Sequence, residues 1–189
     1  MRSLSSLACF AALCSIGCGP IDRADQPDHG EEHIGQYAQA LSVQDAVADG
    51  CSTSQVEGLS LQLVAQGNCI EPGAYAELSP TANATFGSAV LPFMQEPGRD
   101  ALAAALTEHG ETSMKVNSMF RTVAQQYLLY RWYQQGKCGI GLAAKPGSSN
   151  HESGLAIDLT PYSTWKPILE SKGFSWLGAS DPVHFDYKG

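Results

Sequence analysis

Two short segments in the last third of the chain carry side chains that could bind one metal ion together. The first is SNHESGLAID, which contains His151 and Asp158, and the second is DPVHFDY, which contains His184. Two imidazoles and one carboxylate are a ligand set of catalytic zinc sites, in which a fourth position is left for water or substrate. We therefore predict one Zn²⁺ per chain, bound by these three residues.

The residues around these ligands predict two strands that direct them into the same space. Small or acidic residues occupy every second position from 154 to 158, and aliphatic residues occupy the positions between them. Such alternation gives a strand with an aliphatic face in the core and a face that leaves room for an ion beside Asp158. His184 alternates in the same way on a second strand. Asp181, three residues before His184, is the predicted general base for the attacking water.

The motif SxHxxGxAxD followed by DxxH resembles the signature of the M15 zinc peptidases. This family comprises D,D-carboxypeptidases, D,D-dipeptidases and L-alanyl-D-glutamate endopeptidases, which act on peptidoglycan peptides or their precursors. The resemblance covers roughly the last hundred residues, and every position of the signature is filled. The chain is thus identified as a member of this family.

Further site residues follow from the resemblance. The segment FRTVAQQ, which contains Arg121 and Gln126, is similar to the family's Arg-containing segment. This implies that Arg121 projects into the cleft and grips a substrate carboxylate or carbonyl with its planar guanidinium, with Gln126 beside it in the substrate site. Ser149 is implied to contact the substrate backbone, although a turn-forming hydroxyl is an equal alternative. Trp176 is either a wall of the cleft, which we favour, or part of the core.

The resemblance implies hydrolysis of a peptide bond in peptidoglycan stem peptides. Because Arg121 suits capture of a terminal D-Ala carboxylate, we favour a D,D-carboxypeptidase. Asp181 replaces the Glu of the carboxypeptidase branch, so an L-alanyl-D-glutamate endopeptidase of the endolysin type is the alternative. A zinc-containing module that binds wall peptides without cutting them is a third reading, which the presence of Asp181 disfavours. The SxxK, SDN and KTG motifs of serine D,D-peptidases do not occur together in the sequence.

The N-terminus has the composition of an export signal. In residues 1–18, Arg2 precedes an apolar run that is too short to span a membrane, and small residues lead to Cys18. The sequence SIGC resembles a bacterial lipobox, so we favour lipidation of Cys18 over a simply cleaved signal. We expect an exported periplasmic or cell-envelope lipoprotein that is anchored to the outer or cytoplasmic membrane. The net charge of −8 argues against a nucleic-acid partner, and we expect a monomer.

The rest of the chain divides by composition. Residues 19–50 are polar and acidic and are predicted to be a disordered linker. Residues 51–82 are predicted to form a small N-terminal cap, and residues 83–189 the peptidase core. For the core we expect an α+β fold with an antiparallel central sheet, helices packed on one side and the zinc in a cleft. Its strands should include approximately residues 113–121, 154–160 and 183–188.

Three cysteines follow Cys18, namely Cys51, Cys69 and Cys138. An exported protein meets an oxidising compartment in which disulfides form. We predict a Cys51–Cys69 disulfide with Cys138 left free. Pairing of Cys138 with one of the other two is the alternative.

Overall fold

The computed structural model describes residues 42–189, which lie within one compact unit. The predicted signal peptide, Cys18 and most of the predicted linker lie outside these residues. No helix among the described residues is long and apolar enough to cross a membrane. The elements, in chain order, are α1 (Val43–Asp49), the 3₁₀ helix η2 (Thr53–Val56), α2 (Glu57–Ile70), β1 (Ala76–Glu77), β2 (Ala84–Phe86), β3 (Phe93–Met94), α3 (Glu96–Glu108), β4 (Met114–Ser118), α4 (Val123–Gln134), β5 (Ala156–Thr160), α5 (Tyr162–Glu170), β6 (Phe174–Trp176) and β7 (His184–Tyr187).

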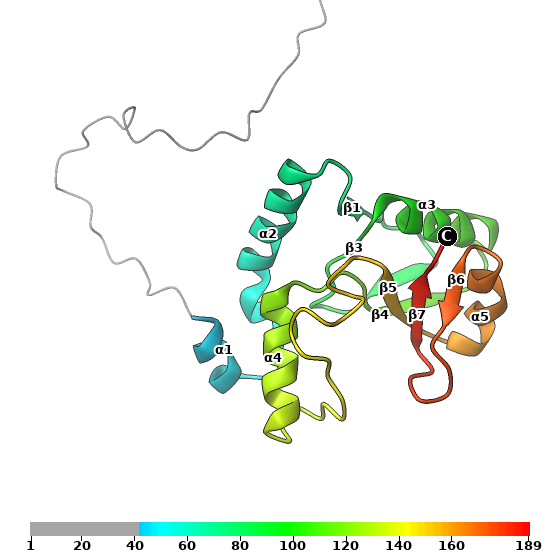
Figure 1. Ribbon diagram of the computed structural model, residues 1–189. Helices are drawn as coiled ribbons and strands as arrows, with labels where there is room; N and C mark the ends of the chain where they lie inside the picture. The colour runs from blue at the N-terminus through cyan, green and yellow to red at the C-terminus, as the bar shows by residue number, and fades with distance from the viewer. Residues whose placement is uncertain (1–41) are drawn as a thin grey trace, which may run out of the picture. The chain divides into compact units, whose positions relative to one another are not determined.

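A five-stranded sheet in the order β2-β4-β5-β7-β6 forms the centre of the fold (Figure 1). Its β4, β5, β7 and β6 are antiparallel neighbours, and β4, β5 and β7 lie within the three predicted strand ranges. The predicted α+β class is therefore confirmed. The expectation of a wholly antiparallel sheet is wrong at one edge, because β2 runs parallel to β4. The chain between them includes α3, and parallel neighbours require a long crossover of this kind.

Helices α3 and α5 cover one face of this sheet (Figure 1). The spacing of apolar residues on each helix, and the strict alternation along β4 and β5, bring both sets into one buried cluster. The helices and the sheet meet through fully buried side chains: Leu102 and Leu106 of α3, Trp165 and Leu169 of α5, and Val116, Ile157, Leu159 and Phe185 of the strands. The opposite side of these strands is thereby left for the polar residues.

The predicted disordered linker extends too far towards the C-terminus. Residues Val43–Asp49 form α1, which begins at a capping box made by Ser42 and Asp45. Ala46 and Val47 are buried in a cluster with α4. The indole N–H of Trp132 on α4 donates a 3.0 Å hydrogen bond to the Val47 carbonyl. Two small apolar residues in this acidic stretch are enough to hold α1 in place, because α4 provides apolar side chains for them to pack against.

The predicted disulfide is also wrong. Cys51 is bonded to Cys138, with 5.3 Å between their Cα atoms, so Cys138 is not free and the alternative pairing holds. Most of the chain between Cys51 and Cys69 is the 14-residue helix α2, which at 1.5 Å per residue is about 21 Å long. A disulfide requires Cα atoms within about 7 Å, so the helix keeps these two cysteines apart.

Candidate active site

Adjacent strands present two of the predicted ligands side by side. Asp158 of β5 is paired in register with His184 of β7. The neighbouring pair, Ile157 and Phe185, is buried in the core on the other face of the sheet. The alternation of a β-strand therefore points Asp158 and His184 away from the core, as predicted.

The third predicted ligand, His151, comes from the turn before β5. Gly154 in this turn has φ +70°, and a Cβ there would lie 3.2 Å from the backbone nitrogen of Gln95. That nitrogen donates a 2.9 Å hydrogen bond to the Gly154 carbonyl, so the close approach requires glycine. The turn is thus packed against the chain just before α3 and directs His151 inwards, where its side chain is buried.

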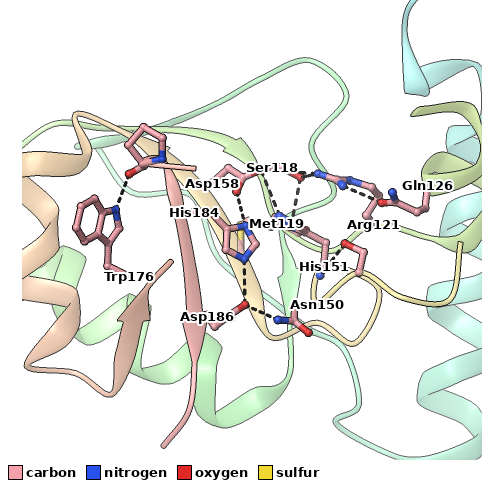
Figure 2. A network of polar contacts seen from close by, with 12 residues as sticks. Ser118, Met119, Arg121, Gln126, Asn150, His151, Asp158, Trp176, His184 and Asp186 are labelled. Atoms are coloured by element: carbon pink, nitrogen blue, oxygen red, sulfur yellow. Dashed lines mark hydrogen bonds and ion pairs between the residues drawn. The ribbon is translucent and has the colours of Figure 1, made fainter. Parts of the chain in front are cut away.

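The structure brings the three predicted ligands together (Figure 2). One ligand atom from each of His151, Asp158 and His184 can be chosen so that all three lie within 4.8 Å of one another. The Nε2 of His151 lies 3.2 Å from Oδ2 of Asp158, and the Nδ1 of His184 lies 2.9 Å from Oδ1 of the same carboxylate. Three donors converging on one point are the arrangement that a metal ion requires.

In each imidazole, one ring nitrogen has a hydrogen-bond partner in the protein, so that the other ring nitrogen faces the metal centre. Nδ1 of His151 lies 2.7 Å from the Met119 carbonyl, which can only accept, so Nδ1 donates and Nε2 is left for a metal. Nε2 of His184 lies 3.0 Å from a carboxylate oxygen of Asp186, which leaves Nδ1 of His184 for the metal. Metal-binding histidines are oriented by such partners. The donor set and its orientation therefore fit a zinc ion.

Asp186 is a site residue that the sequence prediction missed. Its Oδ1 also accepts a 2.9 Å hydrogen bond from the Asn150 amide, and its Oδ2 lies 3.2 Å from the Lys188 ammonium. The alternation along β7 was the available signal, since it puts Asp186 on the same face as His184. Asn150 could not be found in this way, because it reaches Asp186 only through the fold of the turn.

The site is electrostatically coupled. Burial would raise the pKa of Asp158, but hydrogen bonds and charge from His151 and His184 outweigh burial and lower it. Burial likewise opposes the charged form of His184, yet Asp158 and Asp186 raise its pKa above the usual value. The pKa of Asp186 is lowered despite burial, through His184, Asn150 and Lys188. Both carboxylates are therefore anionic at neutral pH, the state that suits a metal cation at the centre.

Arg121 lies beside the metal ligands. A bulge in β4 between Val116 and Ser118 turns Ser118 towards Asp158, its partner on β5. The Arg121 guanidinium donates 2.8 Å hydrogen bonds to the Ser118 hydroxyl and to the Gln126 side-chain oxygen, and lies 3.7 Å from Oδ2 of Asp158. Burial lowers the pKa of Arg121, while the charges of Asp158, Glu152 and Asp181 oppose that shift.

Gln126 does not offer the substrate contact predicted for it. Its side chain is 0% exposed, its oxygen accepts from Arg121, and its nitrogen donates to the Ala144 carbonyl. Both polar atoms are used inside the protein. Gln126 therefore orients the Arg121 guanidinium from behind.

Asp181 lies in the turn that leads into β7. Its backbone N–H donates to the Gly178 carbonyl and its own carbonyl accepts from the His184 N–H, both at 3.2 Å. This turn fixes the separation of Asp181 from the His184 ligand. The carboxylate is near enough to Arg121 to favour the charged guanidinium.

Two other predicted residues have positions that favour their structural alternatives. The Ser149 hydroxyl accepts a 3.3 Å hydrogen bond from the His151 N–H, as expected of a turn-forming hydroxyl. Trp176 is paired with Phe185, so its side chain lies on the helix-covered face of the sheet and not beside His184 (Figure 2). The expectation that Trp176 walls the cleft is therefore wrong. Its indole N–H donates to the Pro182 carbonyl at 2.9 Å, next to Asp181.

A comparison with protein families agrees with this geometry. Residues 97–184 match the family model VanY, described as D-alanyl-D-alanine carboxypeptidase. Residues 97–184 are therefore similar to this peptidoglycan peptidase family, and the predicted enzyme class, a D,D-carboxypeptidase-like metallopeptidase, is confirmed. The match includes all three predicted metal ligands and Asp181, and zinc agrees with the donor set.

Three of the solved structures that are similar to this chain illustrate the likeness. The LdcB LD-carboxypeptidase, from a study of peptidoglycan recognition, shares 16% identity over 63% of this chain and 70% of that chain, with a TM-score of 0.49. A variant of the vancomycin-resistance D,D-pentapeptidase VanY in complex with Zn(II) shares 17% identity over 61% and 78%, with a TM-score of 0.45. VanYB in complex with D-alanine-D-alanine shares 17% identity over 61% and 77%, with a TM-score of 0.46. No curated protein matches the sequence.

Proposed function

We propose that this protein is a zinc-dependent D,D-carboxypeptidase that removes the terminal D-Ala from peptidoglycan stem peptides. The observation that carries the proposal is the position of the Arg121 guanidinium, 3.7 Å from the carboxylate of a metal ligand. A substrate carboxylate bound by Arg121 would lie within one residue's length of the metal centre. The bond presented there is then the last peptide bond of the chain, as an exopeptidase requires.

His151, Asp158 and His184 would hold the zinc ion. When bound, zinc supplies Lewis-acid polarisation of the scissile carbonyl and lowers the pKa of water towards neutrality. The Met119 carbonyl and the Asp186 carboxylate keep the two imidazoles in the ligand orientation.

Asp181 and Arg121 perform the remaining steps. Asp181 takes a proton from the attacking water and passes it to the nitrogen of the leaving amino acid. Arg121 binds the terminal carboxylate, because Ser118 and Gln126 hold its guanidinium in a fixed orientation. A partly buried, pre-oriented cation loses little freedom on binding, so it can discriminate in favour of substrates with a free C-terminus.

We further propose that the enzyme acts outside the cytoplasm, as the peptidoglycan peptidase family of its domain suggests. Cys18 would be lipidated and would tether a monomer to the outer or cytoplasmic membrane. The polar segment between Cys18 and α1 would then let the domain reach wall peptides as its partners. The lipobox-like SIGC sequence and the acidic composition of residues 19–41 support this part.

The test is mass spectrometry of muropeptides after incubation with the zinc-loaded full chain, beside an Asp181→Ala variant. The expected result is loss of one terminal alanine from pentapeptides by the wild type alone. Cleavage between L-Ala and D-Glu would replace the proposal with the endopeptidase alternative. Zinc-loaded protein that binds the peptides without cutting them would leave only a binding module.

A further inference from the structure

A cavity of about 410 Å³ opens beside the metal centre on the side of Arg121. It reaches the metal ligands only through Asp158, and His151, His184 and Asp181 do not line it. Ser118 and Arg121 line it together with Ser52 and Thr53. The cavity therefore adjoins the guanidinium that is proposed to bind the substrate carboxylate, and of the metal ligands it touches Asp158 alone.

Two walls of this cavity come from parts of the chain that precede the family match. One wall is the segment Cys51 to Thr53, and another is the turn from Gly87 to Val90. These walls are not loose. The Cys51–Cys138 disulfide fixes the first wall, and the Gln125 side chain donates to the Ala89 carbonyl at 3.3 Å in the second.

Further contacts keep the first wall against α4. The Trp132 indole N–H binds the Val47 carbonyl before the wall, and the buried Ser60 and Thr122 hydroxyls lie 2.8 Å apart after it. The cavity is thus bordered on both sides by anchored chain. It is preformed, as small-molecule sites are in general.

The lining of the cavity is uncharged apart from Arg121 and Asp158. Hydroxyls of Ser52, Thr53 and Ser88 are accompanied by the apolar side chains of Val90 and Leu129 among the lining residues. If the proposed function holds, Arg121 and Asp158 are occupied by the substrate carboxylate and the metal. A second charge in the cavity would then be desolvated without a partner, which is costly.

We infer that this cavity is a subsite for the side chain of the leaving amino acid, and that it accepts large uncharged D-residues in addition to D-Ala. The inference rests on the proposed function, because Arg121 must bind the terminal carboxylate for the leaving residue to lie there. The methyl group of alanine fills a small part of 410 Å³, a volume within the range that holds whole drug-sized ligands. Residues such as D-Leu or D-Met fit both its size and its neutral lining.

The test uses stem pentapeptides that differ only in their last residue, with the zinc-loaded full chain. For D-Leu and D-Met, kcat/KM should lie within about tenfold of the value for D-Ala, whereas D-Glu and D-Lys should be at least about tenfold poorer. Cleavage of D-Ala peptides with rejection of D-Leu as strong as that of D-Glu would overturn the inference and leave the proposed function standing. Failure to cleave any of the peptides would overturn the proposed function itself.

A substitution that fills part of the cavity tests where the subsite lies. Ser88 is exposed in the turn that lines the cavity, so Ser88→Trp should narrow it, with Ser88→Ala as the matched control. We expect Ser88→Trp to lower kcat/KM for D-Leu at least about tenfold relative to D-Ala, without loss of zinc. Thr53→Trp narrows the same cavity from its other wall and replaces Ser88→Trp if that variant does not fold. An unchanged D-Leu to D-Ala ratio in a folded filling variant would place the leaving side chain elsewhere.

Discussion

The metal centre and the N-terminal segment, residues 43–70, are held in place by different kinds of interaction. At the centre, the ligands stand on paired strands, and each imidazole has a partner for one of its ring nitrogens. Segment 43–70, in contrast, has few buried residues, and several leucines of α2 are exposed. It is attached through a disulfide, through two side-chain hydrogen bonds, Trp132 to Val47 and Ser60 to Thr122, and through two small apolar clusters.

Because of this difference, we expect the metal centre to determine the chemistry and the N-terminal segment to determine what can enter the cavity. The centre belongs to the part of the chain that matches the peptidase family, while the N-terminal segment precedes it and walls the cavity beside Arg121. Changes at the centre should therefore remove metal or turnover while the fold persists. Changes in the N-terminal segment should lower stability or alter selectivity while the chemistry persists.

The largest effect is expected for His151→Ala. Loss of a buried ligand should remove the zinc, and with it several kcal/mol of transition-state stabilisation, so kcat/KM should fall by about a thousandfold or more. His109→Ala is the matched control, because His109 ends α3 and is not among the grouped metal donors. Metal analysis and hydrolysis of a D-Ala-terminated pentapeptide measure both. One zinc per chain in His151→Ala would refute the ligand assignment.

Asp181→Ala should separate metal binding from turnover. Removal of the general base is expected to lower kcat by about 10²- to 10⁴-fold, while the three ligands retain zinc. Asp100→Ala, which removes an exposed carboxylate of α3 paired with Arg99, is the control. Near-normal kcat with zinc bound would exclude Asp181 from the mechanism.

The double variant Cys51→Ser, Cys138→Ser tests how the N-terminal segment is held. The disulfide joins residues 87 positions apart, so its loss should lower the free energy of unfolding by about 4.5 kcal/mol in the chain-entropy model. Urea unfolding of the zinc-loaded protein measures this. Zinc content and kcat for D-Ala peptides should stay near the wild-type values wherever the variant is folded. A fall in kcat as large as that of Asp181→Ala would show that the two regions are not separable.

The contrast between the metal centre and the N-terminal segment also determines which features could be predicted from the sequence. Strands β4, β5 and β7 and the positions of His151, Asp158 and His184 follow from local alternation and a dense motif. These signals are reliable because every second side chain of a strand lies on the same face of the sheet, so strand pairing brings the ligands of neighbouring strands together. Arg121 was found through a segment similar to a known family, but the buried position of Gln126 depends on a distant carbonyl, that of Ala144.

Features that depend on long-range packing could not be predicted in this way. The Cys51–Cys138 disulfide follows from α2 being a helix and from α1 packing on α4. The parallel edge strand β2 follows from the crossover through α3. Trp176 was assigned to the cleft because its strand, β6, and its register with Phe185 were not apparent from composition.

The smallest effect, and the sharpest test of how the centre is built, is expected for Asp186→Ala. Asp186 accepts from Nε2 of His184 and is itself fixed by Asn150 and Lys188. Its removal should weaken zinc binding by about 10- to 100-fold, which competition with a chelator measures, because the imidazole loses both its orienting partner and a nearby negative charge. At saturating zinc, kcat should recover, since Asp158 and Asp181 remain. Asp186→Asn keeps an oxygen acceptor without the charge and should lie between the wild type and Asp186→Ala. Unchanged zinc affinity in both variants would mean that strand pairing alone orients His184, and that the centre does not need a side-chain partner for this imidazole.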